Sequence, residues 1–385
     1  MAHNIAHQIH TDKKPIKVWD LPTRLFHWLF VASFIISFIT QGDSRYLHFH
    51  VVSGYLFTGL LIFRLIWGLV GTHHARFKNF YYPISKVIDH VKNLNNKSQK
   101  EYIGHNPTGG WAIFLIILGS GLTAIFGLLV FGAQENYGPF ASFFSFQQAS
   151  LFSNLHFTFA WFTTAIVVIH ITGVLVETTV FKNNVLMPMI TGYKKIGYSA
   201  PSVELRWKTA LFMVFVVMFF VSNNVKGYFY QTEDNPYMPY GGMRLEMSQQ
   251  WKMACGECHL DYHPSLLPAR SWKTLLEKQN DHFGEELDLE NEDVIVLSKY
   301  AINNSAEQHQ TEAAWFIDKS TPKTDVPLKI TKTFYWKNRH QDIKQSVWEA
   351  DLENNYGMCE ACHFDAKFGT FEDSSMRLPK PKNQA

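Results

Sequence analysis

Five apolar runs, each close to the length needed to cross a bilayer, occupy the first 227 residues of this 385-residue chain. A hydrocarbon core about 30 Å thick requires roughly 20 apolar residues in a helix, because the helix must pair its own backbone groups there. The residues after Gly227 are polar and charged, so we predict a transmembrane helix bundle followed by a separate domain. The runs are Leu25–Gln41, His50–Gly71, Trp111–Gly132, Leu151–Val176 and Ala210–Val225.

The distribution of Lys and Arg sets the predicted orientation of these helices. Basic residues are frequent before the first run, between the second and third, and between the fourth and fifth, whereas Arg45 alone lies between the first and second. Because loops rich in Lys and Arg stay on the cytoplasmic side, we expect a cytoplasmic N-terminus, with everything after Tyr228 outside. A cleavable signal peptide is the competing interpretation of the first run, but no small-residue cleavage site follows it.

Four histidines, His27, His50, His156 and His170, lie in or at the ends of the apolar runs. Polar residues at such depths usually mark function, although a single one is often only a hydrogen-bonded core residue. His156 and His170 are fourteen positions apart in the fourth run. In one helix they share a face within roughly 40° and are separated by about 21 Å. That spacing suits two haems stacked toward opposite faces of the membrane.

Depth in the membrane pairs these histidines. His27 and His170 lie toward the inner side, and His50 and His156 toward the outer side, so we predict that each pair holds one haem b. Two axial imidazoles leave no open position on the iron, which fits electron transfer rather than oxygen chemistry.

Two further residues of the second helix leave alternatives open. His48 is the rival to His50, although two residues apart on a helix they point in different directions. Arg64 lies at about the depth of the inner haem, where a haem propionate would be a suitable partner. Extension of its side chain to the membrane surface is an equally acceptable interpretation.

All four cysteines belong to two CxxCH motifs, each a c-type haem attachment site. Two thiols one helical turn apart can add to the two vinyl groups of a haem, and the adjoining His becomes the proximal ligand. A four-sulfur zinc site is the alternative, but it leaves the His after each pair unexplained. The predicted residues are Cys255, Cys258 and His259 in the first motif and Cys359, Cys362 and His363 in the second.

Each haem c needs a sixth ligand, for which His263, His282, His309 and His340 are the candidates. His263 is too close to its own motif to fold back over the iron, and His309 lies in a polar, Gln-rich stretch. We therefore predict His282 for the first haem c and His340 for the second.

The first half resembles the bacterial cytochrome b561 and nickel-hydrogenase cytochrome b family over roughly residues 17–200. The resemblance implies a four-helix core with two haems b held by the four membrane histidines. His105 is interpreted as part of a turn leading into the third helix, not as a ligand. The matching stretches are Val18–Trp28, His50–Gly54, Arg64–Gly68 and Gly104–Pro107.

The second half resembles the dihaem cytochrome c family of small periplasmic electron carriers over roughly residues 240–380. Such carriers often work with a membrane cytochrome b, and here both are on one chain. The matching stretches are Cys255–His259, Leu266–Trp272, Asp281–Gly284 and Cys359–His363.

The combined prediction is an all-α protein in three parts. Residues 1–200 form a four-helix membrane domain with two non-covalent haems b, and residues 201–240 a fifth, tethering helix and linker. Residues 241–385 form a mainly helical periplasmic domain with two covalent haems c. The location is the bacterial inner membrane. The net charge of +2 gives no reason to expect a nucleic-acid partner.

The predicted function is electron transfer between the quinone pool and a periplasmic cytochrome or redox enzyme. Quinol oxidation rests on the resemblance alone, since no set of residues defines a quinone pocket, and the direction of flow stays open. The alternatives are a haem-bearing anchor subunit of a periplasmic hydrogenase or dehydrogenase, and a haem-based sensor.

Overall fold

The computed structural model describes residues 14–93, 102–196, 201–230, 245–350 and 357–378. Its internal contacts divide the chain into two compact units, each with its own apolar core. The first unit comprises Met1–Ser37, Ser53–Ala124 and His156–Ser222, and the second Phe38–Val52, Ile125–Leu155 and Asn223–Ala385.

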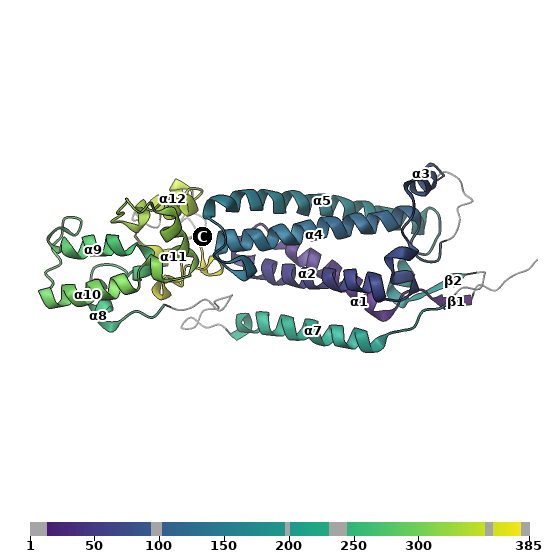
Figure 1. Ribbon diagram of the computed structural model, residues 1–385, viewed down its shortest axis with the longest axis horizontal. Helices are drawn as coiled ribbons and strands as arrows, with labels where there is room; N and C mark the ends of the chain where they lie inside the picture. Colours follow the sequence, from purple (N-terminus) through teal and green to yellow (C-terminus); the bar gives the residue numbers. More distant parts are fainter. Residues whose placement is uncertain (1–13, 94–101, 197–200, 231–244, 351–356, 379–385) are drawn as a thin grey trace, which may run out of the picture. The chain divides into compact units, whose positions relative to one another are not determined.

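Five helices in the described part of the chain are long and apolar enough to cross a membrane, as predicted (Figure 1). Little of their surface is covered by protein: in the most apolar stretch of the fourth, 6 % of the residues are buried. Exposed apolar side chains over such lengths are what lipid-facing helices present. The helices are α1 (Leu21–Ile39), α2 (Leu47–Val70), α4 (Pro107–Glu135), α5 (Phe146–Thr179) and α7 (Trp207–Val225).

All five of these helices begin three to five residues earlier than their apolar runs predict, and α1 and α5 matter most for the histidines. The buried Asp20 caps α1, because its carboxylate accepts a hydrogen bond from the Thr23 backbone N–H at 2.7 Å. His27 therefore lies in the second turn of α1. α5 has 34 residues, about 51 Å of helix, and His156 lies in its third turn. His156 and His170 share this one uninterrupted helix, as the sequence predicts.

In the first unit, α1, α2 and α7 pack around Phe26, Leu60 and Met213. A two-stranded antiparallel ladder closes the unit: β1 (Lys14–Lys17) pairs with β2 (Tyr193–Ile196). The turn before β2 requires Gly192, whose φ of +92° lies in the left-handed region. Its carbonyl accepts the Val18 N–H at 2.8 Å.

Two short helices are not predicted by the apolar runs. They are α3 (Ile84–Lys92), between α2 and α4, and α6 (Leu186–Thr191), which follows α5.

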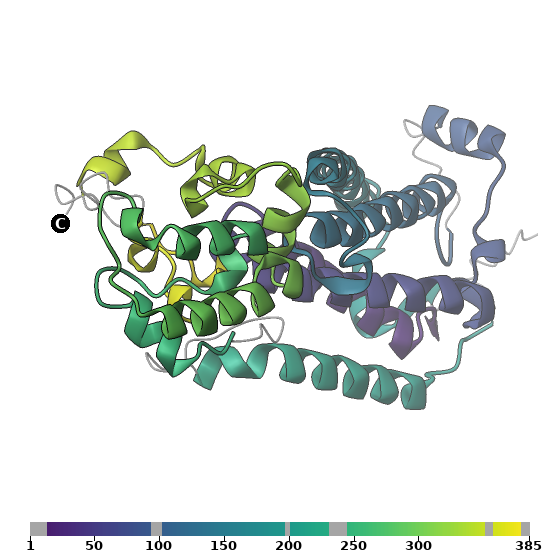
Figure 2. The same cartoon turned by 60° about the vertical axis from the view of Figure 1, so that its left-hand side comes forward.

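The polar part of the second unit is built from short helices around two small cores (Figure 2). Trp251, Leu267 and Leu297 are central to one core, and Phe316 and Ile317 to the other. The elements are α8 (Gln249–Cys255), α9 (Ala269–Glu277), α10 (Asn291–Asn303), α11 (Glu312–Ser320), α12 (Phe334–His340) and α13 (Gln345–Ala350), with 3-10 turns that include η11 (Cys359–Ala361) and η13 (Asp373–Ser375).

Candidate haem-binding sites

The first CxxCH motif begins at the last residue of α8. Ser248 starts this helix by accepting a hydrogen bond from the Trp251 N–H at 3.1 Å. Cys255 is therefore fixed by the helix, and the exposed Cys258 follows in the turn. The rings of His259 and His282 lie 6.3 Å apart, centre to centre, with 25° between their planes.

The second CxxCH motif forms a single tight turn. The His363 N–H donates to the Cys359 carbonyl at 2.8 Å, which draws the two ends of the motif together. His340, the last residue of α12, stacks on Trp336 at 4.3 Å. The rings of His340 and His363 are 6.0 Å apart.

Both ring separations fit two imidazoles on one iron. Two metal–nitrogen bonds of about 2 Å, plus about 1 Å from each nitrogen to its ring centre, place the ring centres about 6 Å apart. The Nδ1 atoms of His259 and His340 lie 2.7 and 2.8 Å from the carbonyls of Leu260 and Trp336. An Nδ1–H donated to a carbonyl leaves Nε2 for the metal.

Burial favours the neutral forms of the ionisable groups at these sites. It lowers the pKa of His363 to about 4, with His340 and Arg339 adding to the effect. It also raises the pKa of the Cys255 and Cys359 thiols to about 12. Neutral imidazole is the form that binds a metal.

The other two candidate ligands, His263 and His309, lie against each other at 5.2 Å between ring centres. His263 is buried, and its Nδ1 accepts the Ser265 N–H at 3.1 Å. That bond places the proton on Nε2, where an iron would have to bind. The structure thus brings His282 and His340, and not these two, next to the CxxCH histidines.

In the first unit, His27 of α1 and His170 of α5 are close enough to interact electrostatically. His27 Nδ1 has no hydrogen-bond partner among the described residues. His156 Nδ1 lies 2.9 Å from the Thr123 carbonyl, so Nε2 is the ring nitrogen that could bind an iron. His50 belongs to the second unit, so its pairing with His156 stays a prediction. The Nε2 atom of His48, the rival to His50, lies 2.7 Å from the Asn224 carbonyl.

Arg64 is buried, with 5 % of its surface exposed, and its guanidinium lies over the Phe77 ring at 4.6 Å. One terminal nitrogen, Nη1, has no hydrogen-bond partner among the described residues. Asp20 is close enough to interact with Arg64 electrostatically, but it leaves Nη1 without an acceptor. An unsatisfied buried polar atom is costly, so this geometry fits a further anionic partner such as a haem propionate.

His105 is a residue of this inner site that sequence reasoning missed. It is packed between Trp19 and Phe80, with ring centres 4.8 and 4.5 Å away. Burial lowers its pKa to about 3, and Arg64, His170 and His27 contribute as nearby groups. The turn that contains it was recognisable in the sequence, but nothing there shows that the turn folds back toward α1 and α5.

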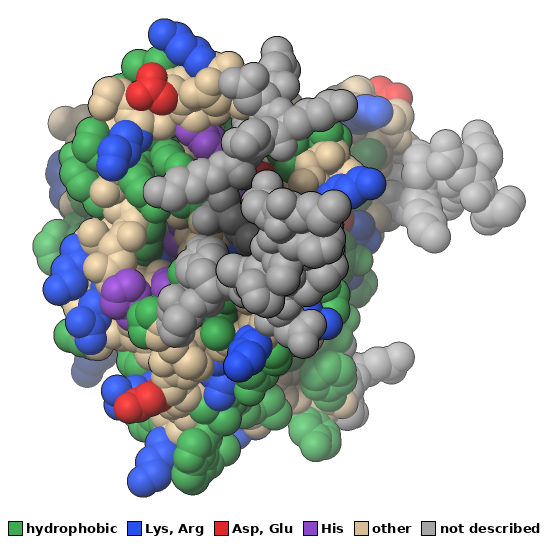
Figure 3. Space-filling view, turned by 90° about the vertical axis from the view of Figure 1, so that its right-hand side faces the viewer, with side chains coloured by type: hydrophobic (Ala, Val, Ile, Leu, Met, Phe, Trp, Pro, Cys, Tyr) green, Lys and Arg blue, Asp and Glu red, His purple; other side chains and the backbone are tan. Residues whose placement is uncertain are grey.

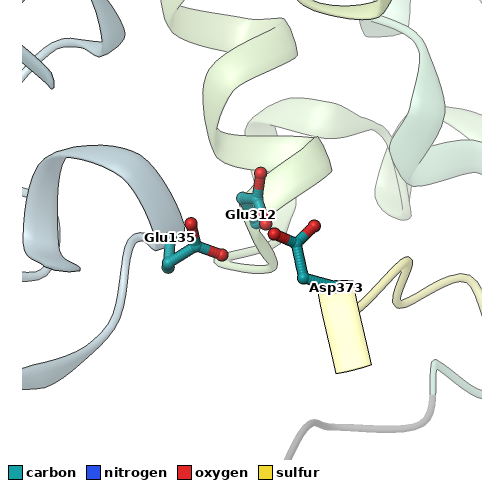
Figure 4. A group of neighbouring side chains, drawn as sticks. All are labelled: Glu135, Glu312 and Asp373. Carbon is teal, nitrogen blue, oxygen red and sulfur yellow. The ribbon is translucent and has the colours of Figure 1, made fainter. Parts of the chain in front are cut away.

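In the second unit, a cluster of acidic residues was also not predicted (Figure 4). Carboxyl oxygens of Glu135, Glu312 and Asp373 lie within 4.8 Å of one another. Arg339 lies 2.7 Å from Asp373 and 3.3 Å from Glu312, and the Tyr335 hydroxyl donates to Glu312. Because the chain supplies its own cation, we interpret the cluster as an ion-pair network that joins the end of α4 to α11 and η13.

Two family models match separate parts of the chain. The model for prokaryotic cytochrome b561 matches residues 18–192, and the model for dihaem cytochrome c matches residues 251–371. Between them they cover all the predicted iron-ligating residues.

Relatives of the first half are named as hydrogenase subunits. A probable Ni/Fe-hydrogenase B-type cytochrome subunit of Cupriavidus necator is 25% identical over 242 residues, which cover 50% of this chain and 96% of that protein. The probable Ni/Fe-hydrogenase 1 B-type cytochrome subunit of Escherichia coli K12 is 24% identical over 211 residues, with 46% and 89% covered.

Solved structures of diheme cytochromes c are similar to about a third of the chain. The diheme cytochrome c from Rhodobacter sphaeroides is 28% identical, covering 33% of this chain and 98% of that one, with a TM-score of 0.30. A diheme cytochrome from Shewanella baltica OS155 is 21% identical, covering 34% and 92%, with a TM-score of 0.28. From the two family matches and the five apolar helices, the chain is a membrane electron-transfer protein that joins a prokaryotic cytochrome b561 domain to a dihaem cytochrome c domain.

Proposed function

We propose that this protein carries electrons through the bacterial inner membrane, between the quinone pool and a periplasmic redox partner. One observation carries the proposal: each CxxCH histidine has a second imidazole at the distance expected for two ligands of one iron. The ring centres lie 6.3 and 6.0 Å apart. Iron with both axial positions filled exchanges electrons and has no site for a substrate.

The proposed cofactors are two non-covalent haems b and two haems c held by thioether bonds. When bound, each haem supplies a one-electron iron couple; the protein supplies axial ligands, position and polarity. Arg64 would hold a propionate of the inner haem b. The proposed thioether residues are Cys255, Cys258, Cys359 and Cys362. The proposed iron ligands are His27 with His170, His50 with His156, His259 with His282, and His363 with His340.

We place the domain boundaries at residues 1–200, 201–240 and 241–385, with residues 231–240 of the linker outside the described part of the chain. The N-terminus lies in the cytoplasm and the cytochrome c domain in the periplasm. The Lys and Arg distribution supports this orientation, and so does the presence of both CxxCH motifs after the fifth helix.

The test is a pyridine haemochrome assay on the purified protein, followed by reduction with a quinol analogue in membranes. We expect equal amounts of haem b and haem c. Quinol should reduce the haems b first and the haems c after them. Failure of quinol to reduce any haem in a fully loaded protein would remove the quinone pool from the proposal.

A second candidate function is suggested by the names of the relatives, which are hydrogenase subunits. The chain would be the haem-bearing membrane subunit of a periplasmic hydrogenase, and electrons would run inward to quinone. Addition of hydrogen to native membranes would then reduce the haems c before the haems b. The opposite order, with quinol as the donor, supports outward flow.

A further inference from the structure

The short helix α3 has an apolar face that no described part of the chain covers. Ile84, Ile88 and Val91 are 53 %, 47 % and 50 % exposed, and none of the nine residues of the helix is buried. At 100° per residue these three side chains fall within roughly 60° of arc. Val87 lies beside them and widens the stripe.

The opposite side of α3 is polar. Ser85, Lys86 and Asp89 project away from the apolar stripe. His90, also on this side, contacts Tyr102 of the same unit at 5.9 Å between ring centres. The helix thus turns a polar residue toward its own protein and its apolar stripe outward. A helix exposed only to water would place these faces the other way round.

The segments before and after α3 indicate its depth relative to the membrane. α2 ends at Val70 and α4 begins at Pro107, so α3 lies between two membrane-crossing helices on one side of the bilayer. Tyr81 lies 6.0 Å from Trp111, in the first turns of α4. Tyr and Trp gather where lipid headgroups meet the hydrocarbon. α3 starts three residues after Tyr81.

The positive charge of this segment favours anionic lipid headgroups. Lys78, Lys86 and Lys92 are exposed, and Asp89 is the acidic residue of the helix. Lys and Arg side chains are spread over this side of the molecule, with hydrophobic side chains between them (Figure 3). Interfacial helices bind by this combination of a buried apolar face and attraction to anionic lipids.

We propose that α3 lies in the headgroup layer of the inner leaflet, with Ile84, Ile88 and Val91 in the acyl region and Lys86 and Lys92 on anionic headgroups. The occupant of the exposed face is the lipid surface, not a second protein. α3 would thereby hold the inner end of α2 and α4, next to Arg64 and His105, at a fixed depth.

The test uses the full-length protein in vesicles of phosphatidylglycerol and phosphatidylcholine. Ile88→Cys, in the apolar stripe, and Asp89→Cys, about 100° further round on the polar side of α3, each receive a nitroxide spin label, with the unsubstituted chain as the labelling background. We expect the ratio of oxygen to nickel-chelate accessibility to be several-fold higher at position 88 than at 89. Equal access of the nickel chelate to both labels would overturn the proposal, because α3 would then lie in water. Shielding of label 88 from both reagents would also overturn it, by showing a protein partner.

A second arm tests the headgroup contact. In vesicles of phosphatidylcholine alone, the accessibility ratio at position 88 should fall. Lys86→Gln combined with Lys92→Gln should produce the same fall in the mixed vesicles. A ratio independent of lipid charge and of both lysines would overturn the anionic-lipid part. The haem content of each variant, measured by the haemochrome assay, is expected to stay unchanged, so the electron-transfer proposal is tested separately.

Discussion

The two halves of this molecule collect their predicted iron ligands in different ways. In the cytochrome c part, both thiols and one imidazole of each site come from five consecutive residues, and a single helix end or turn holds them. In the membrane part, the predicted ligands come from three different helices, and only tertiary packing can bring them together. A local site can form wherever its peptide is held, whereas a distributed site exists only when the whole bundle is assembled. The membrane sites should therefore be the more sensitive to single substitutions.

The largest expected effect is the loss of a membrane haem. His170→Ala should abolish binding of the inner haem b, because no other imidazole on α5 lies at that depth. The haemochrome ratio of b to c should fall by half while the haems c are retained. Thr172→Ala is the matched control: its hydroxyl donates a hydrogen bond back to the Val168 carbonyl of the same helix. Unchanged b-type absorbance in His170→Ala would remove this residue from the ligand set.

A smaller effect is expected from exchanging a ligand of a local site. His340→Met should keep the second haem c attached, because both thioethers remain. Its midpoint potential should rise on the order of 100 mV, since an axial Met stabilises ferrous iron relative to an axial His. His309→Met is the control and should change no potential. A higher potential in His309→Met and an unchanged one in His340→Met would make His309 the ligand and His340 the control.

The ion-pair network around Arg339 should contribute to the stability of the fold and not to electron transfer. Arg339→Met leaves the buried Glu312 carboxylate and the half-buried Asp373 carboxylate without their cation, a change that typically costs about 3–5 kcal/mol at a buried site. Denaturant unfolding of the full chain, followed at the c-haem absorbance, measures it. Lys319→Met removes an exposed partner of Asp318 and should cost less than about 1 kcal/mol. Similar losses in both variants would show that the network is not a strong structural element.

The last prediction concerns the pH dependence of stability. Burial raises the pKa of Glu372 to about 8, although the Tyr137 hydroxyl donates to its carboxylate at 2.6 Å and works against the rise. Because the folded form binds this proton more tightly, the stability that it contributes is lost as pH rises from about 4.5 to about 8. The loss is at most about 1.4 kcal/mol per pH unit.

Hydrogen exchange of the amides around Glu372, corrected for intrinsic rates, should show this decline. Glu372→Gln should remove it, whereas Glu292→Gln, an exposed position on α10, should not. A decline that persists in Glu372→Gln would assign the proton to another group.

The sequence predicts the features that depend on short range. The five membrane helices follow from apolar length, and the CxxCH motifs from their spacing. α1 begins at Leu21, before its apolar run, because the carboxylate of Asp20 caps its first turn. Hydropathy does not detect a helix start that depends on a polar cap. α3 was missed because nine residues with an apolar stripe do not resemble a membrane span.

Residues that become neighbours only in the folded chain were beyond sequence reasoning. His105 lies in a loop with no helical periodicity, yet it is packed between Trp19 and Phe80. Glu135 closes an apolar helix and resembles an ordinary polar end, although its partners are more than 170 positions away. Such contacts depend on how loops return to the bundle, and no local pattern encodes that return.

The ladder between β1 and β2 gives the membrane part a boundary of its own. It fastens the segment before α1 to the segment after α5, so the first four crossings are closed into a loop before α7 begins. The two ends of this four-helix segment are therefore tied together by residues of the segment itself. Gene fusion could attach a different domain after this segment without opening the ladder that closes it.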